Sequence, residues 1–367
     1  MMQTIKKYWA GLSLLAITLA GLSLRFYHLN YQGCFSEELF TIDTIRLSYW
    51  NVVLDAFIKP QSGEPPFYFI AAKISADLLG GASLLSIRLP AAILGTLCIP
   101  AIYALGREYY NELAGLFAAL MIALSERMVF YSQYGRPYTM IFLFFIFAAY
   151  CFIRIQKKSP FAQGMVLFVL ATGLCLWSHF YSAVPLSVFW VILIWQNRKA
   201  VVPYLAMGIL PALAFGLYME RVAGEYFTKP VSVIYPASVF NVTWIDNLFR
   251  VPYECWGYLA VPLIPAFLYY VWTRKDRIAQ WFGLAAGITF LSMLVLTVLF
   301  NPSARYAVLI APLVIVPVAV LVTECIESRK KSSQRFVLSA GVIYVIIMAN
   351  LFPLIALYTT TYRFVFL

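Results

Sequence analysis

Residues 306–323 read YAVLIAPLVIVPVAVLVT, a stretch without a single charged side chain. An uninterrupted apolar run of this length is typical of a helix that crosses a lipid bilayer. The remainder of the chain has the same character, since 62% of its 367 residues are hydrophobic and only 12% are charged. A soluble domain cannot bury so large a share of apolar side chains. The sequence therefore predicts an all-α polytopic membrane protein.

Apolar segments of spanning length recur along the whole chain. Eleven are predicted, near residues 8–24, 89–106, 113–131, 138–153, 162–178, 182–196, 202–219, 257–272, 279–299, 306–323 and 336–357. An odd number of spans places the two termini on opposite sides of the membrane. The first segment lacks a small-residue cleavage site, so we expect it to be a membrane helix and not a cleaved signal peptide.

The segment PPFYFIAAKISADLL (65–79) is interpreted differently. It is short, and it carries Lys73 and Asp77, each of which costs about 2.5–3.5 kcal/mol at the centre of a membrane helix. Its apolar residues recur at helical spacing. We therefore expect an amphipathic helix that lies along the membrane interface.

Basic residues predict the orientation of the chain. With a cytoplasmic N-terminus, the predicted inner loops are short and basic, as in RIQKKS (154–159) and SRKKSSQR (328–335), which agrees with the positive-inside rule. These residues also explain the net charge of +11, and we find no nucleic-acid-binding motif. We predict one transmembrane domain over 1–367 in the plasma membrane, with large extracytoplasmic loops at 25–88 and 220–256 and no separate soluble domain.

The first outer loop contains a pair of adjacent acids, Glu37 and Glu38, in the apolar and aromatic segment GCFSEELFTI (33–42). Adjacent carboxylates repel each other. A nearby cation, a metal or a polar substrate must therefore favour their charge, or one of them must stay protonated.

Three further polar segments are predicted on the same outer face: YSQYGRPY (131–138), SHFYS (178–182) and NPSARY (301–306). Each one alone is consistent with an interfacial anchor. Together with the acidic pair, they bring Arg136, His179 and Arg305 to one side of the membrane. Charged residues and histidine that converge at helix ends are typical of a functional site.

These motifs, in this order, resemble the GT-C superfamily of membrane glycosyltransferases, in the branch of the protein O-mannosyltransferases and the lipid A aminoarabinose transferase. SEELFT (36–41) is similar to the family's D-E-x-x-T motif, EPPFYF (64–69) to H-P-P-L-Y-Y, and YSQYGRPY to Y-S-Q-E-A-R-P-Y. IRLP (87–90), SHFYS and ARY (304–306) resemble its R-L-P, T-H-Y-F and R-Y motifs. Three residues depart from the pattern: Glu37 replaces Asp, Tyr134 replaces Glu, and Glu64 replaces His.

The resemblance implies a GT-C fold and an inverting enzyme. Such an enzyme moves a sugar from a polyprenyl- or dolichyl-phosphate donor to an extracytoplasmic acceptor, which is a protein, a lipid or a glycan. It implies Glu37 as general base with Glu38 beside it, and Arg305 and Arg136 on the donor phosphate. The residues that shape the sugar and acceptor site would be Tyr138, Tyr306, His179 and Glu64. Whether the enzyme uses a divalent metal is left open, with Glu37 and Glu64 as candidate ligands.

Two other functions remain open for the sequence, a membrane transporter and a flippase of lipid-linked sugars. Transporters typically have charged residues near the bilayer midplane and repeated halves, whereas here the polar residues gather at helix ends and no repeat is visible. A disulfide between Cys34 and Cys255, the two cysteines predicted on the outer side, is a separate hypothesis.

Overall fold

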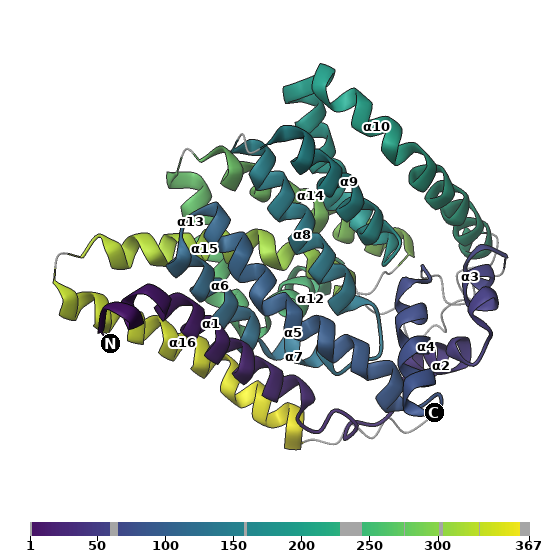
Figure 1. Cartoon of the computed structure of the whole chain (residues 1–367), viewed down its shortest axis with the longest axis horizontal. Coiled ribbons are helices and arrows are strands. Elements are labelled where there is room, and N and C mark those ends of the chain that lie inside the picture. Colours follow the sequence, from purple (N-terminus) through teal and green to yellow (C-terminus); the bar gives the residue numbers. More distant parts are fainter. Residues whose placement is uncertain are drawn as a thin grey trace.

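The computed structural model describes residues 2–58, 65–157, 160–227, 244–274, 276–300, 304–329 and 331–359. These ranges are helical and contain no strand (Figure 1), which confirms the all-α class. In chain order the helices are α1 (Met2–Phe26), α2 (Ser36–Ile45), α3 (Tyr49–Ile58), α4 (Phe67–Leu79), α5 (Leu84–Tyr109), α6 (Glu112–Leu124), α7 (Glu126–Ser132), α8 (Tyr138–Gln156), α9 (Phe161–Leu176), η1 (Phe180–Ser182), α10 (Ala183–Phe227), α12 (Trp244–Trp256), η3 (Gly257–Leu259), α13 (Ala260–Thr273), α14 (Arg277–Phe300), η4 (Ala304–Leu309), α15 (Ile310–Glu327) and α16 (Ser332–Thr359).

The predicted membrane segments all lie on these helices. Among the described residues, eight helices are long and apolar enough to cross a membrane, or nine if the bent pair α6–α7 is one span. The count is lower than the predicted eleven because α9 has only 16 residues and α10 contains two predicted segments. α10 is broken at Asn197, where φ is −138°, and its second arm extends to α3 (Figure 1). The polytopic membrane architecture is confirmed.

The break between α6 and α7 is stabilised by a buried arginine. The two helices meet at 62°. The last carbonyls of a helix have no partner within it, and here the guanidinium of Arg25 donates to the carbonyls of Ile122 and Ala123 at 2.9 and 3.1 Å. Arg25 itself is fully buried. The end of α1 is therefore tied to the bend from which α7 leads to the candidate site.

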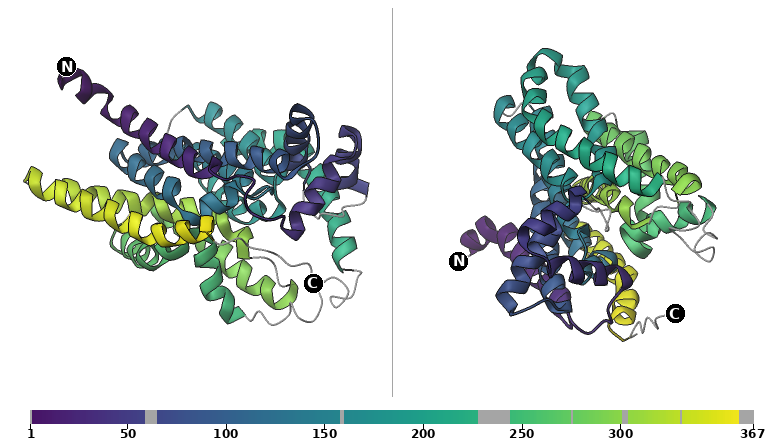
Figure 2. Two further views of the ribbon diagram at one scale, coloured as in Figure 1. Left: turned by 90° about the horizontal axis from the view of Figure 1, so that it is seen from below. Right: turned by 90° about the vertical axis from the view of Figure 1, so that its right-hand side faces the viewer.

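The first and last described helices run in the same direction (Figure 2). At their C-terminal ends the ring of Tyr27, just after α1, lies 5.2 Å from that of Tyr358 in α16. The amide of Gln32 also donates to the carbonyl of Leu357. The C-terminal ends of α1 and α16 therefore lie side by side.

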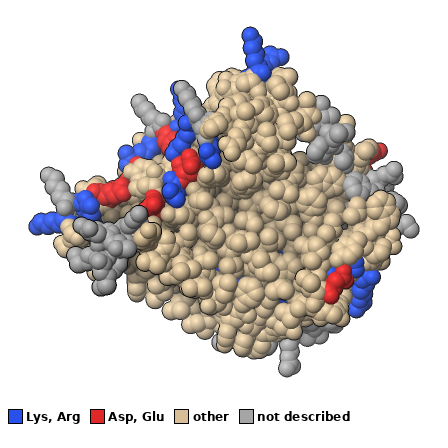
Figure 3. All heavy atoms as spheres, viewed as in Figure 1, with Lys and Arg blue, Asp and Glu red and all other residues tan. Residues whose placement is uncertain are grey.

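The predicted inner loops lie together at the opposite end of the bundle. Lys157 donates to the carbonyl of Tyr109 at 2.9 Å, and Asn111 donates to Glu327 at 2.9 Å. Most charged side chains in Figure 3 lie toward the upper left, a smaller group lies at the lower right, and a broad surface without charges lies between them. Such a surface is what a protein embedded in lipid requires.

The segment 65–79 forms a helix, α4, that is not among the candidate spans. Its small residues Ala72 and Ala76 are buried, and α4 packs against α5 and α2. Ile74 and Leu78 face outward and are 47% and 81% exposed. An inner face of small residues and an outer face of large apolar residues fit the predicted interfacial helix.

The second large loop, predicted at 220–256, is shorter than expected. α10 continues to Phe227 and α12 begins at Trp244, so both ends of this range are helical. Residues 228–243 lie outside the described ranges.

The cysteines of the predicted outer side are not joined. Cys34 and Cys255 are both free thiols. Cys255 is buried, and its thiol donates to the carbonyl of Ala307 at 3.2 Å. The structure therefore does not support the disulfide hypothesis.

Candidate active site

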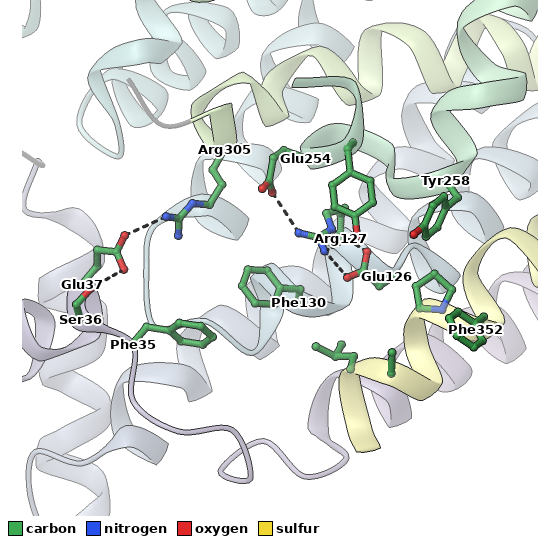
Figure 4. A pocket seen from close by; sticks show the side chains of 14 residues that line it. Phe35, Ser36, Glu37, Glu126, Arg127, Phe130, Glu254, Tyr258, Arg305 and Phe352 are labelled. Atoms are coloured by element: carbon green, nitrogen blue, oxygen red, sulfur yellow. Dashed lines mark hydrogen bonds and ion pairs between the residues drawn. The ribbon is translucent and has the colours of Figure 1, made fainter. Parts of the chain in front are cut away.

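Three parts of the chain that are distant in sequence meet at the end of the bundle opposite the inner loops. α2 presents Glu37 in its first turn, the α7–α8 connection presents Tyr134, and η4 presents Arg305. Glu37 and Arg305 line a cavity of about 460 Å³, a size typical of small-molecule sites. Figure 4 shows the two side chains facing each other at one side of this cavity.

The carboxylate of Glu37 is held by two side chains. Arg305 approaches it at 3.0 Å, and the hydroxyl of Tyr134 donates to it at 2.7 Å. Arg305 also donates to the Tyr134 hydroxyl at 3.0 Å, which closes a three-membered network. Arg136 donates to the backbone carbonyl of Glu37 at 3.2 Å. Four predicted or motif residues are thus brought together, with Glu37 at the centre.

Glu37 is an ionised carboxylate in this environment. Burial raises its pKa, but the charge of Arg305 and the hydrogen bond from Tyr134 outweigh burial, so the net pKa lies below the ordinary value. The side chain of Glu37 remains 39% exposed. It can therefore accept a proton or a hydrogen bond from a molecule in the cavity.

Glu38 has a different environment from its neighbour. Its carboxylate is fully buried and pairs with Arg88, whose Nε and Nη2 approach at 2.8 and 2.6 Å. The backbone N–H groups of Gly135 and Phe35 also donate to it, at 2.7 and 3.1 Å. Each of the two adjacent acids thus has its own arginine, Arg305 for Glu37 and Arg88 for Glu38, and these cations offset the repulsion between the carboxylates. Glu38, which was predicted beside the base as a catalytic residue, does not line the cavity.

Comparisons with known proteins identify a matching sequence family and a similar fold. Residues 63–219 match the family described as dolichyl-phosphate-mannose-protein mannosyltransferase. The structure of ArnT from Cupriavidus metallidurans bound to undecaprenyl phosphate superposes with a TM-score of 0.64 at 14% identity, over 97% of this chain and 66% of that one. The chain has the GT-C fold. The archaeal oligosaccharyltransferase AglB from Archaeoglobus fulgidus, in complex with an inhibitory peptide and a dolichol-phosphate, gives a TM-score of 0.57 at 14% identity.

The chain is shorter than the solved structures that it matches. It spans 66% of the length of ArnT and 55% of that of AglB, although 97% and 95% of its own residues are covered. A comparison with curated protein sequences finds no significant match.

Two of the three departures from the GT-C pattern lie at the centre of the site. Glu37 stands where the family has Asp, and Tyr134 where many members have Glu. The phenol of Tyr134 bridges Glu37 and Arg305 without adding a negative charge. At this side of the cavity, Glu37 is therefore joined by a neutral phenol.

Three predicted residues lie behind this network, in a row of rings in contact with one another. Tyr138 stacks on Tyr134 with the ring centroids 5.8 Å apart, and Tyr306 lies 6.4 Å from Tyr138. His179 is 4.5 Å from Tyr306, and its Nδ1 accepts from the backbone N–H of Tyr181 at 3.2 Å. Burial and the charge of Arg136 lower the pKa of His179 to about 3, so its ring is neutral. These rings support the site and do not line the cavity of Figure 4.

A metal site is not formed by the described part of the chain. No three His, Cys, Asp or Glu side chains among the described residues come together as metal ligands. Glu64, predicted as a site residue and as a candidate ligand, lies outside the described residues. The other candidate, Glu37, has a guanidinium at 3.0 Å, and a cation at that distance opposes the binding of a divalent ion. The described side chains at this site therefore do not fit a metal ion.

Sequence reasoning missed two arginines of this GT-C site. Arg88 lies in the R-L-P motif and was given no role, although it also donates to the carbonyls of Gln32 and Gly33 at 2.8 Å. Arg127 lines the other side of the cavity and forms ion pairs with Glu126 and Glu254. A lone arginine at the start of an apolar helix was a signal for Arg88, because such a charge requires a partner. Nothing in the sequence links Arg127 to Glu254, which is 127 residues away.

Proposed function

We propose that this protein is an inverting glycosyltransferase that uses a polyprenyl- or dolichyl-phosphate sugar as donor and acts on an extracytoplasmic acceptor. The observation that carries this proposal is the pair of Glu37 and Arg305 at a cavity in a GT-C fold. The family match and the lipid phosphates in the ArnT and AglB structures support the donor class.

Glu37 is proposed as the general base. The acceptor oxygen attacks the anomeric carbon while the bond from that carbon to the phosphate oxygen breaks, and the bonding electrons leave with the phosphate. The hydroxyl proton passes to the Glu37 carboxylate. With one carboxylate acting as base and none forming a covalent intermediate, the anomeric configuration is inverted.

Arg305 is proposed to bind the donor phosphate. Its side chain is 25% exposed and lines the cavity, so a phosphate can reach it and replace Glu37 as its partner. A guanidinium suits this role because it stays charged and can grip two phosphate oxygens. This exchange also frees the Glu37 carboxylate for the acceptor hydroxyl. Arg136 adds positive charge nearby. Tyr138, Tyr306 and His179 are proposed to shape the sugar and acceptor site from behind Tyr134, and Glu64 is proposed to contribute to it.

The proposed location of this site is the extracytoplasmic side of the plasma membrane, with the N-terminus in the cytoplasm. The basic inner loops support this orientation. A cysteine introduced at residue 55 should react with an impermeant reagent added outside cells, whereas a cysteine at residue 157 should not. Labelling at 157 but not at 55 contradicts the orientation.

The decisive assay presents purified full-length protein with a panel of polyprenyl-phosphate sugars and a mixture of acceptors. We expect release of polyprenyl phosphate from one donor, and a product with the opposite anomeric configuration by NMR. Glu37→Gln should abolish the release. Movement of the intact lipid-linked sugar across liposomes, without release of polyprenyl phosphate, would instead indicate a flippase.

A further inference from the structure

The cavity has a second polar side, opposite the pair of Glu37 and Arg305. There Arg127 forms ion pairs with Glu126 at 2.6 Å and with Glu254 at 3.3 Å, and it donates to the hydroxyl of Tyr253 at 3.1 Å. Tyr258 completes this group, which we call the Arg127 subsite. Figure 4 shows it across the pocket from the pair of Glu37 and Arg305, with Phe130 between them.

The charge of the Arg127 subsite decides which molecule can occupy it. Two carboxylates and one guanidinium leave one net negative charge, while Glu37 and Arg305 together are neutral. A phosphate is repelled from the Arg127 subsite, so the donor phosphate belongs at Arg305. The Arg127 subsite is left for a neutral molecule.

Hydrogen-bonding groups of both kinds are available in the Arg127 subsite. Glu254 accepts from Tyr131 and Arg127 through Oε2, and within the described part of the chain its Oε1 receives no hydrogen bond. The hydroxyl of Tyr253 accepts from Arg127, so its own hydrogen is left to donate. A free acceptor beside a free donor matches neighbouring hydroxyl groups, each of which can donate and accept.

Aromatic rings surround these polar groups. Tyr253 and Tyr258 pack edge to face with centroids 5.7 Å apart, and Phe130 lies under Arg127 at 5.4 Å. The C–H faces of sugar rings are apolar and pack against such aromatic surfaces, while their hydroxyls bind polar groups at the rim. The Arg127 subsite therefore offers both the aromatic surface and the hydrogen-bonding groups that bind a carbohydrate.

From this geometry we infer that the Arg127 subsite binds a neutral sugar ring, and that the acceptor of the transfer reaction is therefore a carbohydrate. The assignment of this sugar as the acceptor rests on the proposed function, but the binding of a sugar to the Arg127 subsite does not. A sugar held by Glu254 and Tyr253 lies in the same cavity as Glu37, so one of its hydroxyls can face the base.

The test measures binding of probes to the full-length protein in lipid nanodiscs, by saturation-transfer NMR and without any donor. The probes are neutral methyl glycosides of glucose, galactose, mannose and N-acetylglucosamine, together with glucose 6-phosphate and an end-capped peptide rich in Ser and Thr. We expect one neutral glycoside to bind in a manner that depends on Glu254 and Tyr258, and the peptide not to bind. Any binding of glucose 6-phosphate through Arg305 should not depend on these two residues.

Glu254→Gln keeps the shape of the side chain and should weaken glycoside binding at least about tenfold, since a charge-assisted hydrogen bond is lost. Tyr258→Ala should also weaken it, and because Tyr258 is 56% exposed this variant is expected to fold normally. Glu327→Gln, at the opposite end of the bundle, is the matched control and should bind like the wild type.

Three results would overturn the inference: no neutral glycoside binds, the glycoside binds equally well to Glu254→Gln and Tyr258→Ala, or only the peptide or the sugar phosphate binds. The outcome is separable from the proposed function. If glycoside binding maps to the Arg127 subsite but no donor is turned over, the transferase proposal fails alone. If sugar is transferred but the glycoside does not bind there, this inference fails alone.

Discussion

Glu37 and Glu38 are neighbours in sequence and each pairs with an arginine, yet the two pairs are built differently. Glu38 and Arg88 are 0% exposed and their hydrogen bonds are satisfied by the protein. Glu37 and Arg305 are 39% and 25% exposed and line the cavity. A buried, fully paired carboxylate is held in place, whereas an exposed pair can exchange its partners for those of a substrate. Within a single turn of α2, the Glu38–Arg88 pair therefore stabilises the structure, whereas the Glu37–Arg305 pair is available to a substrate.

The largest expected effect comes from breaking the buried pair. Arg88→Met leaves the Glu38 carboxylate buried without its partner, which typically costs about 3–5 kcal/mol. We expect a strong fall in the apparent midpoint of thermal unfolding in detergent. The double variant Arg88→Met with Glu38→Gln should recover part of the loss, because no uncompensated charge remains. A single variant that unfolds at the wild-type temperature would show that Glu38 and Arg88 do not hold the site together.

A smaller effect, on turnover and not on stability, is expected at the exposed pair. Arg305→Lys keeps the charge but loses the two-pronged contact with phosphate, so transfer should fall about 10- to 100-fold. Arg305→Ala should be slower still. Steady-state rates with an identified donor test this. If both variants turn over like the wild type, Arg305 is only an interfacial anchor.

The smallest effect is expected at Tyr134 and appears as a shift in pH dependence. A general base must be deprotonated, so activity is lost as the pH falls through the pKa of Glu37. The hydrogen bond from Tyr134 helps to lower that pKa. Tyr134→Phe removes the bond and should move the acid limb of the kcat/KM profile to higher pH. An unchanged acid limb would mean that Glu37 is not the titrating base, or that Tyr134 does not reach it during turnover.

The membrane fold was largely predictable because apolar runs of spanning length follow directly from the thickness of the bilayer. The breaks within those runs were less predictable. Asn197 interrupts α10 through its backbone angles, and the bend between α6 and α7 depends on Arg25, which is 97 residues from one of the carbonyls that it caps. A hydropathy pattern contains neither the backbone angles of one residue nor a tertiary contact of this kind.

The site was predictable in part, through its resemblance to a known family. The motifs indicated Glu37, Arg136 and Arg305, and the structure brings all three together. They did not separate Glu38 from Glu37, since identical side chains in adjacent positions differ only in burial and partners. The roles of Arg88 and Arg127 were missed because their partners are 50 and 127 residues away in the sequence.

The most direct test of this account compares Glu37→Gln with Glu38→Gln, measuring sugar transfer and thermal unfolding of both proteins side by side. Glu37→Gln should unfold like the wild type and lose about 10²–10⁴ in transfer rate, the usual contribution of a positioned base. Glu38→Gln should unfold at a lower temperature, and its folded fraction should retain more activity than Glu37→Gln. Normal transfer by Glu37→Gln, together with a folded but inactive Glu38→Gln, would contradict the assignment of the two carboxylates.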